Sequence, residues 1–337
     1  MSPSEEILSE YAAALAGAVV CSRAGRGLID ITGKDRSAWL HNLVTNEVKK
    51  LQPGEGNYAF AVNIKGRCIF DCNMLIDAER ILLDVDSRWL DASIKHLTKY
   101  TITEDVTLKD VSAAFGRIAI MGPGAAAVVG RLCGANLTPM AQLQHVAVTI
   151  AGADVRLFRN DFAGLPCAEL IVPADAMHGV TAAIDAGGPL PRIGDDAVRI
   201  LRIEAGIPAS VDDIDGDVVP PETMQTERGI SYHKGCYLGQ EVIERMRSHG
   251  VLPRKLVGIR IEGDAIPPRD SAVDVDGALV GRVMSGAWSP SLSATLALAY
   301  MKAAHAQPGK AIRVSGAAQA WPVEVVPLPV RRNGPRP

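Results

Sequence analysis

The sequence predicts an α+β protein in which a large region of mixed sheets and helices is followed by a small C-terminal β-barrel or sandwich. Two observations predict this fold class. The first quarter of the 337 residues alternates short strand-like and helix-like segments. From Arg254 onwards the chain consists of short β-rich runs broken by Gly, Pro and Asp, and none of them has the length and period of an amphipathic helix. The pattern therefore changes near residue 252.

The first hundred residues are predicted to contain a strand, two helices and a hairpin. Residues 26–31 are strand-like, and Asp35 can cap a helix with Trp39 and Leu40 on its apolar side. A second helix is expected from Ser87.

The hairpin is predicted by two β-like runs, at 58–64 and 68–76, that flank a Lys-Gly turn. Because side chains alternate along a strand, four side chains of the second run are expected on one face: Cys68, Phe70, Cys72 and Met74. Asp71 and Asn73 are expected on the other face.

Strands and helices continue to alternate up to residue 205. Strands are expected at 117–121, 145–150, 154–159 and 167–172. An alanine-rich helix follows the first of these, a helix capped by Asp175 follows the last, and Asp195 can cap a further helix that runs to Ala205. Within the C-terminal region, strands are expected at 255–261, 278–284, 295–301, 311–314 and 323–326.

Composition and charge exclude several classes of protein. The chain has 35 Lys and Arg against 38 Asp and Glu, a formal net charge of −3, which argues against a nucleic-acid binder. No apolar run approaches the roughly 18–20 residues that cross a bilayer, and the first ten residues are acidic where a signal peptide is basic. We therefore expect a cytoplasmic protein with neither a membrane nor a direct nucleic-acid partner.

Neither the cysteines nor the acidic residues predict a metal site. The six cysteines include no C-x-x-C pair and no cluster with histidine at zinc-site spacing. Four aspartates lie close together at 212, 213, 215 and 217, but no starting aspartate gives the Gly and Glu spacing of an EF-hand loop. A solvated turn is the better interpretation of this acidic loop.

Glu204 is placed unusually for a charged residue. It lies on the apolar stripe of the predicted helix that ends at Ala205, and in the last turn, where the helix dipole disfavours an anion. Such a carboxylate needs donors, which either a ligand or a neighbouring arginine such as Arg199 or Arg202 could supply. The residues alone leave both possibilities open.

Cys236 is the cysteine with the most reactive setting. It lies between Gly235 and Gly239, close to Lys234, and just ahead of a predicted short helix. A lysine charge and a helix N-terminus both favour a thiolate, and glycines allow a partner to approach the backbone. A reactive, accessible thiol and an inert loop cysteine both remain open, because no paired general base is identifiable.

The segment around Cys236 resembles the signature of the folate-binding YgfZ family, bacterial relatives of a mitochondrial iron–sulfur assembly protein. The signature K-G-C-[FY]-x-G-Q-E-x-x-x-R is matched by Lys234, Gly235, Cys236, Tyr237, Gly239, Gln240, Glu241 and Arg245. Further matching segments follow the family's order at 33–36, 45–47, 65–67, 201–208, 220–222, 281–285 and 297–300. The resemblance therefore covers nearly the full length.

The wider superfamily includes the glycine-cleavage aminomethyltransferase, or T-protein, to which residues 159–173 are also similar. This resemblance implies a folate-binding region of two subdomains wound around a central cavity. We assign that region to residues 1–251, the β-barrel to 252–330 and a frayed tail to 331–337.

The resemblance also implies the residues that contact the folate. The family's glutamate at the position of Glu204 binds the pterin ring of tetrahydrofolate, which favours a ligand over an arginine as its partner. Asp71 is expected to line the folate cavity with it, and Arg159 and Tyr237 complete the expected cofactor-binding set.

The function implied by the YgfZ resemblance is a tetrahydrofolate-binding accessory protein for iron–sulfur cluster assembly or repair. Its clients would include tRNA-modifying enzymes, so the expected partners are folate and iron–sulfur client or assembly proteins. Cys236 would carry thiol chemistry or a transient cluster contact, and Lys234 would support the thiolate or an anionic group.

The main alternative is a folate-dependent aminomethyltransferase or small-amine demethylase. A module that keeps the fold for binding alone is a further alternative. Two departures from the transferase argue against transfer. Phe70 takes one position of its acidic pair, and residues 162–165 read Phe-Ala-Gly-Leu where it has Tyr-Thr-Gly-Glu. Whether the chain turns over a substrate is open, and an enzyme would be a one-carbon transferase.

Overall fold

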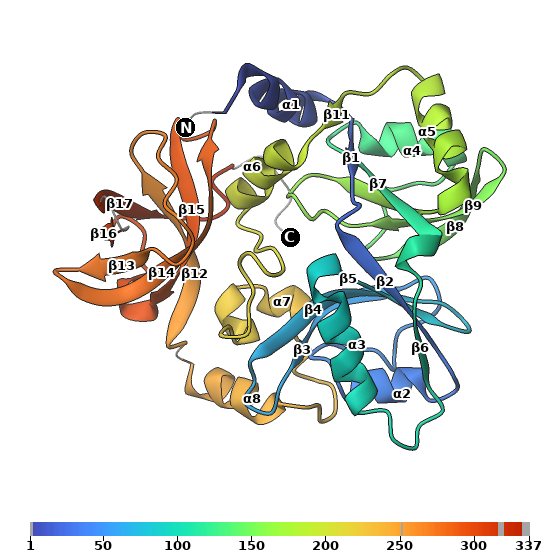
Figure 1. The fold of residues 1–337 in the computed structure, drawn as a ribbon, viewed down its shortest axis with the longest axis horizontal. Coiled ribbons are helices and arrows are strands. Elements are labelled where there is room, and N and C mark those ends of the chain that lie inside the picture. Colours follow the sequence, from blue (N-terminus) through green and yellow to red (C-terminus); the bar gives the residue numbers. More distant parts are fainter. Residues whose placement is uncertain (1–2, 251, 316–319, 332–337) are drawn as a thin grey trace.

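The computed structural model describes residues 3–250, 252–315 and 320–331. Two β-sheets and a closed β-barrel surround a common centre (Figure 1). In this view the barrel lies on the left, a six-stranded sheet at the upper right and a five-stranded sheet at the lower right. This architecture confirms the predicted α+β class with its C-terminal barrel.

The five-stranded sheet is antiparallel and has the order β3-β4-β5-β2-β6. Its strands are β2 (Arg26–Thr32), β3 (Gly56–Val62), β4 (Cys68–Ile76), β5 (Ile81–Asp86) and β6 (Thr107–Asp110). Helices α2 (Arg36–His41) and α3 (Leu90–Lys99) cover one face, because Leu40 and Leu97 belong to the same apolar cluster as Phe70. The other face of the sheet is turned to the centre of the molecule.

One prediction for β4 is wrong. Phe70, Cys72 and Met74 share the helix-covered face as expected, but Cys68 belongs to the central apolar cluster instead. The pairing of β3 with β4 shifts register there, so that Val62 pairs with Cys68 and Ala61 with Phe70. The irregularity inserts an extra residue, and side chains before it face the opposite side.

The six-stranded sheet has the order β11-β1-β7-β10-β9-β8. Its strands are β1 (Val19–Ser22), β7 (Phe115–Met121), β8 (His145–Ile150), β9 (Ala153–Arg159), β10 (Cys167–Pro173) and β11 (Arg192–Ile193). Helices α4 (Ala125–Cys133) and α5 (Met177–Ala186) cover its outer face, where Val129 and Ile184 share an apolar cluster with Leu170. The two sheets are thus built alike, each with a helical layer outside and an inner face that contributes to the central apolar cluster.

Four more helices connect these layers to the barrel. They are α1 (Glu5–Ala16), α6 (Asp195–Ala205), α7 (Thr226–Gly229) and α8 (Gln240–His249). Helices α1 and α6 lie between the six-stranded sheet and the barrel, and α7 and α8 lie between the barrel and the five-stranded sheet (Figure 1). Short 3₁₀ turns are η1 (Ser87–Trp89), η2 (Ser112–Ala114), η3 (Ala174–Ala176), η4 (Pro220–Thr223) and η5 (Ala303–His305).

The barrel closes in the order β12-β15-β14-β13-β16-β17 around its own apolar interior. Its strands are β12 (Arg254–Ile261), β13 (Ala272–Val275), β14 (Ala278–Ser289), β15 (Ala294–Lys302), β16 (Ala311–Ser315) and β17 (Ala320–Val326). Five of these six coincide with predicted strands. Sequence reasoning missed β13, which is four residues long and breaks register with β14.

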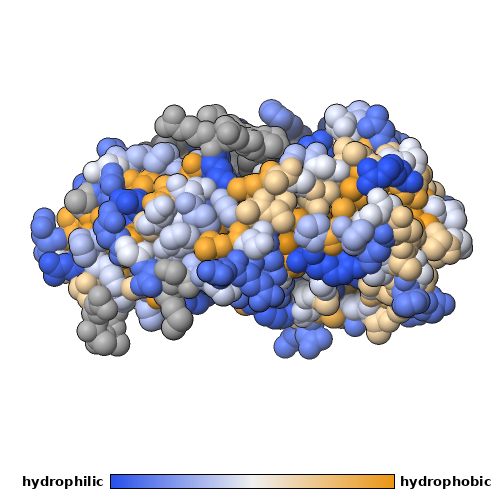
Figure 2. Space-filling view, turned by 90° about the horizontal axis from the view of Figure 1, so that it is seen from above, coloured by the Kyte–Doolittle hydropathy of each residue, from blue (hydrophilic) through white to orange (hydrophobic). Residues whose placement is uncertain are grey.

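The surface seen from above is hydrophilic over the barrel side, and apolar residues are more frequent over the sheets (Figure 2). Within the described residues, no helix combines the length and the apolar character needed to cross a bilayer. Of the predicted tail at 331–337, only Arg331 falls within the described residues.

Candidate functional site

A central cavity of about 420 Å³ lies between the inner faces of the two sheets and helix α6. Its lining includes Tyr58, Asp71, Asn160, Phe162, Ser210 and Arg228, which come from five different segments of the chain. This volume is in the range of sites for small-molecule ligands. A cavity where both sheets meet one helix is therefore the first candidate for the binding site.

Asp71 is the acidic group on the inner wall of this cavity. It lies on β4, and the alternation of that strand turns it inward while Phe70 points to the helices. One carboxylate oxygen accepts from the Tyr58 hydroxyl at 2.9 Å and the other from the Ser210 hydroxyl at 2.5 Å. Both bonds come from hydroxyl groups, so Asp71 has hydrogen-bond donors but no positive partner among the described residues.

Tyr58 forms the surface beside Asp71. Burial, together with the neighbouring Asp71, raises the pKa of Tyr58 well above its ordinary value, so the phenol remains a donor. The Arg228 guanidinium carbon lies over the ring, 4.1 Å from its centroid. Tyr58 thus contacts both an acidic and a basic group of the same cavity.

Behind the cavity, a buried ion network joins the two sheets. Arg117 on β7 donates to Asp84 of β5 at 2.7 Å and to Glu169 of β10 at 3.2 Å. Arg26 also donates to Asp84 at 2.8 Å, and all four side chains are at least 87% buried. Burial alone would raise the pKa of Asp84, but Arg117 and Arg26 overcome that effect and lower it below its ordinary value.

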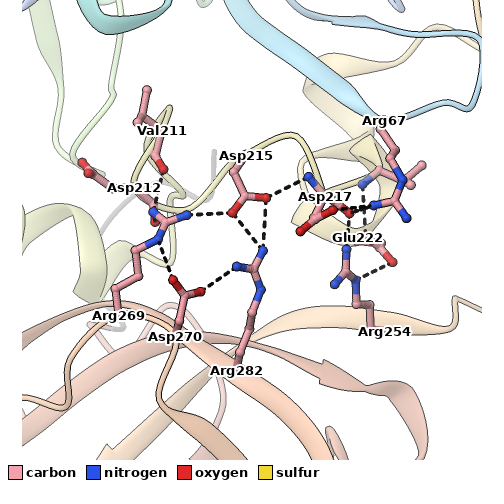
Figure 3. A network of polar contacts seen from close by, with 11 residues as sticks. Arg67, Val211, Asp212, Asp215, Asp217, Glu222, Arg254, Arg269, Asp270 and Arg282 are labelled. Atoms are coloured by element: carbon pink, nitrogen blue, oxygen red, sulfur yellow. Dashed lines mark hydrogen bonds and ion pairs between the residues drawn. The ribbon is translucent and has the colours of Figure 1, made fainter.

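The acidic loop after α6 is only in part the predicted solvated turn, since Asp217 is exposed but Asp213 is buried and Asp215 is half-buried. Asp215 pairs with Arg269 at 2.7 Å and with Arg282 of the barrel at 2.9 Å (Figure 3). Asp213 is fully buried and pairs with Arg202 of α6 at 2.6 Å. The prediction was wrong for Asp213 and Asp215. Arg202 lies on the helix just before the loop, whereas Arg269 and Arg282 follow it at a distance that the sequence does not bring together. The loop joins the barrel to the wall of the cavity.

Glu204 does not line the central cavity. It is fully buried at the seam between α6, α1 and the barrel, where it accepts from Tyr11 at 2.7 Å and from Ser289 at 2.5 Å. Arg331, which follows the barrel, pairs with it at 3.0 Å. Of the two possibilities left open by the sequence, the geometry matches the structural ion pair, although with neither Arg199 nor Arg202.

Lys234 is also used by the scaffold. Its ammonium donates to the backbone carbonyls of His41, Val44 and Asn46 at 2.5, 2.6 and 2.9 Å. An ammonium has three donors, so none remains for a thiolate at Cys236 or for an anion. Burial lowers the pKa of Lys234 to about 7. The expected support of Cys236 by Lys234 is therefore not what this geometry shows.

Cys236 itself is exposed, as predicted, whereas four of the other cysteines are buried and Cys133 is intermediate. Gly239, at φ +77°, directly precedes α8 and touches the hairpin turn, since an added Cβ would lie 2.3 Å from the Asn63 carbonyl oxygen. Gly235, by contrast, faces open space. The loop that carries Cys236 is anchored at both ends and open in the middle.

The remaining residues of the motif lie on the first turns of α8. Gln240 is its first residue, and Glu241 pairs with Arg245 at 2.7 Å on an exposed face of the helix. These three residues support the helix that follows Cys236. They do not line the central cavity.

Arg159 and Tyr237 lie outside the central cavity as well. Arg159 pairs with Asp161 at 2.8 Å and donates to the Met140 carbonyl at 2.8 Å. Tyr237 packs in the central apolar cluster, with the Lys234 ammonium 5.0 Å from its ring centroid. Of the four residues predicted to contact the cofactor, only Asp71 lines the cavity.

Sequence reasoning missed Tyr58, Ser210 and Arg228, since nothing local marks them. A signal for the network behind the cavity was present, because Arg117, Asp84 and Glu169 each interrupt an otherwise apolar strand. Charged residues in such strands are rarely buried unless they are paired. Three such strands predict a shared ion network.

Comparison with known proteins gives a consistent result along the chain. The GCVT N-terminal domain family matches residues 3–226, and the glycine cleavage T-protein C-terminal barrel domain matches residues 254–330. Aminomethyltransferase of Synechococcus elongatus is 28% identical over 315 residues, 91% of this chain and 83% of that protein. Aminomethyltransferase of Geobacillus kaustophilus is 29% identical over 317 residues, 91% and 85% of the two chains.

Among solved structures, the glycine cleavage system aminomethyltransferase T from Bartonella henselae has the same fold. The TM-score is 0.84 and the alignment covers 96% of this chain and 89% of that one. The sequences are 19% identical, so the likeness concerns the fold.

Proposed function

This chain belongs to the GCVT family of the glycine-cleavage T-protein, and we propose that it binds a reduced folate in the central cavity and moves a one-carbon unit between that folate and an amine. The names of its relatives support transfer more than they support the iron–sulfur accessory role. The proposal is therefore closer to the transferase alternative than to the function that the YgfZ motif implies.

The observation that carries this proposal is the setting of Asp71. A reduced pterin presents N–H donors, and these bind a carboxylate more strongly than they bind a neutral acceptor. Tyr58 and Ser210 occupy only two of the roughly four acceptor positions of the Asp71 carboxylate. The others are available to a ligand in the cavity, and no ion pair occupies them among the described residues.

One of the two departures from the transferase loses its force. Phe70 packs with Leu40 and Leu97 on the helix-covered face of β4. An acidic side chain at that position would face α2 and α3 and could not reach a ligand in the cavity. The second departure remains, since Phe162 does line the cavity and stacks under the Arg23 guanidinium at 3.7 Å.

Calorimetric titration with 5-formyltetrahydrofolate tests the binding step. Asp71→Asn should weaken binding by about 1.5–3 kcal/mol, or roughly 10- to 150-fold, because a charge-assisted hydrogen bond is lost. Asp30→Asn is the matched control, since Asp30 lies on β2 of the same sheet and outside the cavity. Equal affinities for the wild type and Asp71→Asn would remove Asp71 from the site.

The transfer step needs its own measurement. With tetrahydrofolate and an aminomethyl donor, the protein should form methylenetetrahydrofolate and release one ammonia for each methylene group transferred. Binding without this product would reduce the proposal to folate binding alone.

A second function is favoured by the exposure of Cys236. We also propose an accessory role for iron–sulfur enzymes, in which the bound folate and the exposed thiol serve one client protein. In cells, Cys236→Ser should lower iron–sulfur enzyme activity at an unchanged level of the protein. Cys133→Ser is the control, because Cys133 is the next most accessible cysteine. Equal enzyme activity in the two strains would contradict the accessory role.

A further inference from the structure

Residues 210–212, here called the strap, form part of the wall of the central cavity. Ser210 and Asp212 both line the cavity, and the Ser210 hydroxyl donates to the Asp71 carboxylate at 2.5 Å. Ser210 is buried, whereas the Asp212 side chain is 45% exposed. The strap therefore runs between the solvent and the inner carboxylate of the cavity.

The base of the strap is fixed. The backbone N–H of Ala209 donates to the Asp213 carboxylate at 2.9 Å, and the N–H of Asp213 donates to the Ala209 carbonyl at 2.8 Å. The buried pair between Asp213 and Arg202 anchors this base to α6. Movement is therefore confined to the three residues of the strap.

Val211, in the middle of the strap, has an unfavourable backbone conformation. Its φ is +66°, in a region that a β-branched residue rarely adopts. Val211 also belongs to none of the apolar clusters of the described residues. Because no apolar burial compensates for the strained backbone, polar contacts must hold the strap in place.

Two arginines from different parts of the fold supply these polar contacts. Arg88, which follows β5, donates to both carboxylate oxygens of Asp212 at 2.8 and 3.2 Å and to the Ser210 carbonyl at 3.0 Å. Arg269, from the barrel, donates to the carbonyls of Val211 and Asp212 at 2.6 and 2.5 Å (Figure 3). The strap is thus fastened to a sheet by one arginine and to the barrel by the other.

The fastening by Arg88 is the weaker of the two. The side chains of Arg88 and Asp212 are 49% and 45% exposed, and an exposed ion pair contributes little and is screened by salt. Arg88 also keeps a partner in Asp86, at 2.8 Å, when it releases the strap. Arg269 instead binds backbone carbonyls and pairs with Asp215, whose side chain is largely buried. Release from the sheet therefore costs less than release from the barrel.

We propose that the strap is a gate of the central cavity, with the Arg88–Asp212 ion pair as its latch. When the latch opens, Val211 leaves its strained conformation and Ser210 withdraws from Asp71. A folate enters or leaves through this open state, and the strap then closes over the cavity again. The inference rests on the proposed function and deepens it, because it adds a control of entry to the same site.

Amide hydrogen exchange on the purified full chain, without ligand, tests the motion itself. The amides of Val211 and Asp212 are hydrogen-bonded in the closed strap, to the carbonyls of Ile214 and Ser210. Arg88→Gln removes the latch and should speed the exchange of both amides by about fivefold. Raising NaCl from about 50 to about 500 mM should speed exchange in the wild type and change it little in Arg88→Gln.

A second variant should act in the opposite direction. Val211→Asn should slow the exchange of both strap amides by about threefold, because asparagine tolerates a positive φ and the closed strap is then less strained. Since Val211 does not line the cavity, this variant changes no contact with a ligand there.

Arg67→Gln is the matched control. Arg67 also binds the acidic loop through a carboxylate and a carbonyl, both of Asp217, but lies outside the cavity and the strap. It should leave the exchange of both strap amides unchanged. The melting temperatures of all variants show whether each is folded.

Stopped-flow binding of 5-formyltetrahydrofolate tests the gate. Because entry and exit both pass through the open strap, Arg88→Gln should raise the association and dissociation rate constants by a similar factor of about fivefold. Val211→Asn should lower both, and the dissociation constant should stay within about twofold in each variant. An increase confined to the dissociation rate of Arg88→Gln would make Arg88 a ligand contact and overturn the gate.

The outcomes separate this inference from the function on which it rests. The expected exchange in a protein that binds no folate would overturn the folate proposal and support the moving strap. Exchange that Arg88→Gln leaves unchanged, or that Arg67→Gln speeds equally, would overturn the strap. The expected exchange with unchanged folate rate constants would overturn its role as a gate.

Discussion

The central cavity and the loop from Lys234 to Gly239 differ in how the chain builds them. Tyr58 and Asp71 come from the two strands of one hairpin, Arg228 comes from α7 much later in the chain, and all three line one cavity. The loop is continuous in sequence and carries a recognisable motif, yet its only prominent chemical group, Cys236, faces outwards. The cavity forms only when the chain folds, whereas the residues of the motif are neighbours in the sequence.

The motif also contains more scaffold than chemistry. The Lys234 ammonium fastens the 41–46 loop, Gly239 lets α8 approach the hairpin turn, and Tyr237 fills the apolar centre. A sequence signature therefore marks residues that position a site as readily as residues that act in it. The predictions below test this difference between the two regions, in order of decreasing expected effect.

The largest effect is expected from Arg117→Met, which acts behind the cavity. Removing the guanidinium leaves the buried carboxylates of Asp84 and Glu169 without their shared partner. Breaking a buried pair in this way costs about 3–5 kcal/mol of unfolding free energy, measured by urea denaturation. Arg156→Met is the control, because its pair with Asp77 is partly exposed and should contribute less than about 1 kcal/mol.

The same variant has a defined pH dependence. Because the pKa of Asp84 is lowered in the folded protein, its contribution to stability is complete above the unfolded value of about 4 and is lost as the pH falls below it. Arg117→Met reduces that lowering, so its stability should fall less steeply than the wild type's on acidification from pH 4. If the unfolding free energy of Arg117→Met fell as steeply with pH as that of the wild type, Arg26 alone would keep Asp84 charged.

Glu204→Gln should give the next largest loss, about 3 kcal/mol, because Arg331 and Tyr11 then lack their buried carboxylate. The affinity for 5-formyltetrahydrofolate should not change, since Glu204 lies outside the cavity. Asp71→Asn should do the reverse and weaken folate binding at nearly unchanged stability. A loss of folate affinity in Glu204→Gln, at unchanged stability, would restore the pterin role implied by the family resemblance.

The fold was predictable further than the site. Alternation and turn residues are local, and they predicted the α+β class, the change near residue 252 and five of the six barrel strands. The predicted caps were wrong, since Asp35 makes no capping hydrogen bond through its side chain, and Ala176 and Gly194 take the N-cap positions expected for Asp175 and Asp195. These local patterns failed at β4, where one extra residue turns the Cys68 side chain to the opposite face of the sheet. Within the site, the sequence predicted the inward face of Asp71 and the exposure of Cys236.

What sequence reasoning could not supply were the partners. The helix pattern showed that Glu204 needed donors, but Arg331 and Tyr11 lie more than a hundred residues away in the chain. The acidic loop was interpreted as solvated for the same reason, since Arg269 and Arg282 follow it at a distance (Figure 3). Local pattern identifies a charge that needs compensation, and only tertiary structure identifies what compensates it.

Lys234→Met tests whether the lysine of the motif is part of the scaffold. It leaves three backbone carbonyls without their donor, which should cost about 1–3 kcal/mol and increase amide exchange in the 41–46 loop. Lys49→Met, an exposed neighbour, should change neither. Alkylation of Cys236 should change by less than about twofold, and a tenfold slower reaction at full stability would instead indicate direct support of the thiolate.

The smallest effect on stability, and the largest on reactivity, is expected at Cys236. Cys236→Ser should change the unfolding free energy by less than about 0.5 kcal/mol, because an exposed side chain in an open loop loses few contacts. In the wild type at neutral pH, alkylation followed by mass spectrometry should find Cys236 labelled first and Cys133 next. Burial raises the pKa of Cys68, Cys72 and Cys167 and so removes both access and thiolate from them. Labelling of Cys236 more slowly than Cys133 would mean that the loop closes over the thiol in solution, and the difference between an outward-facing thiol and an enclosed ligand cavity would no longer hold.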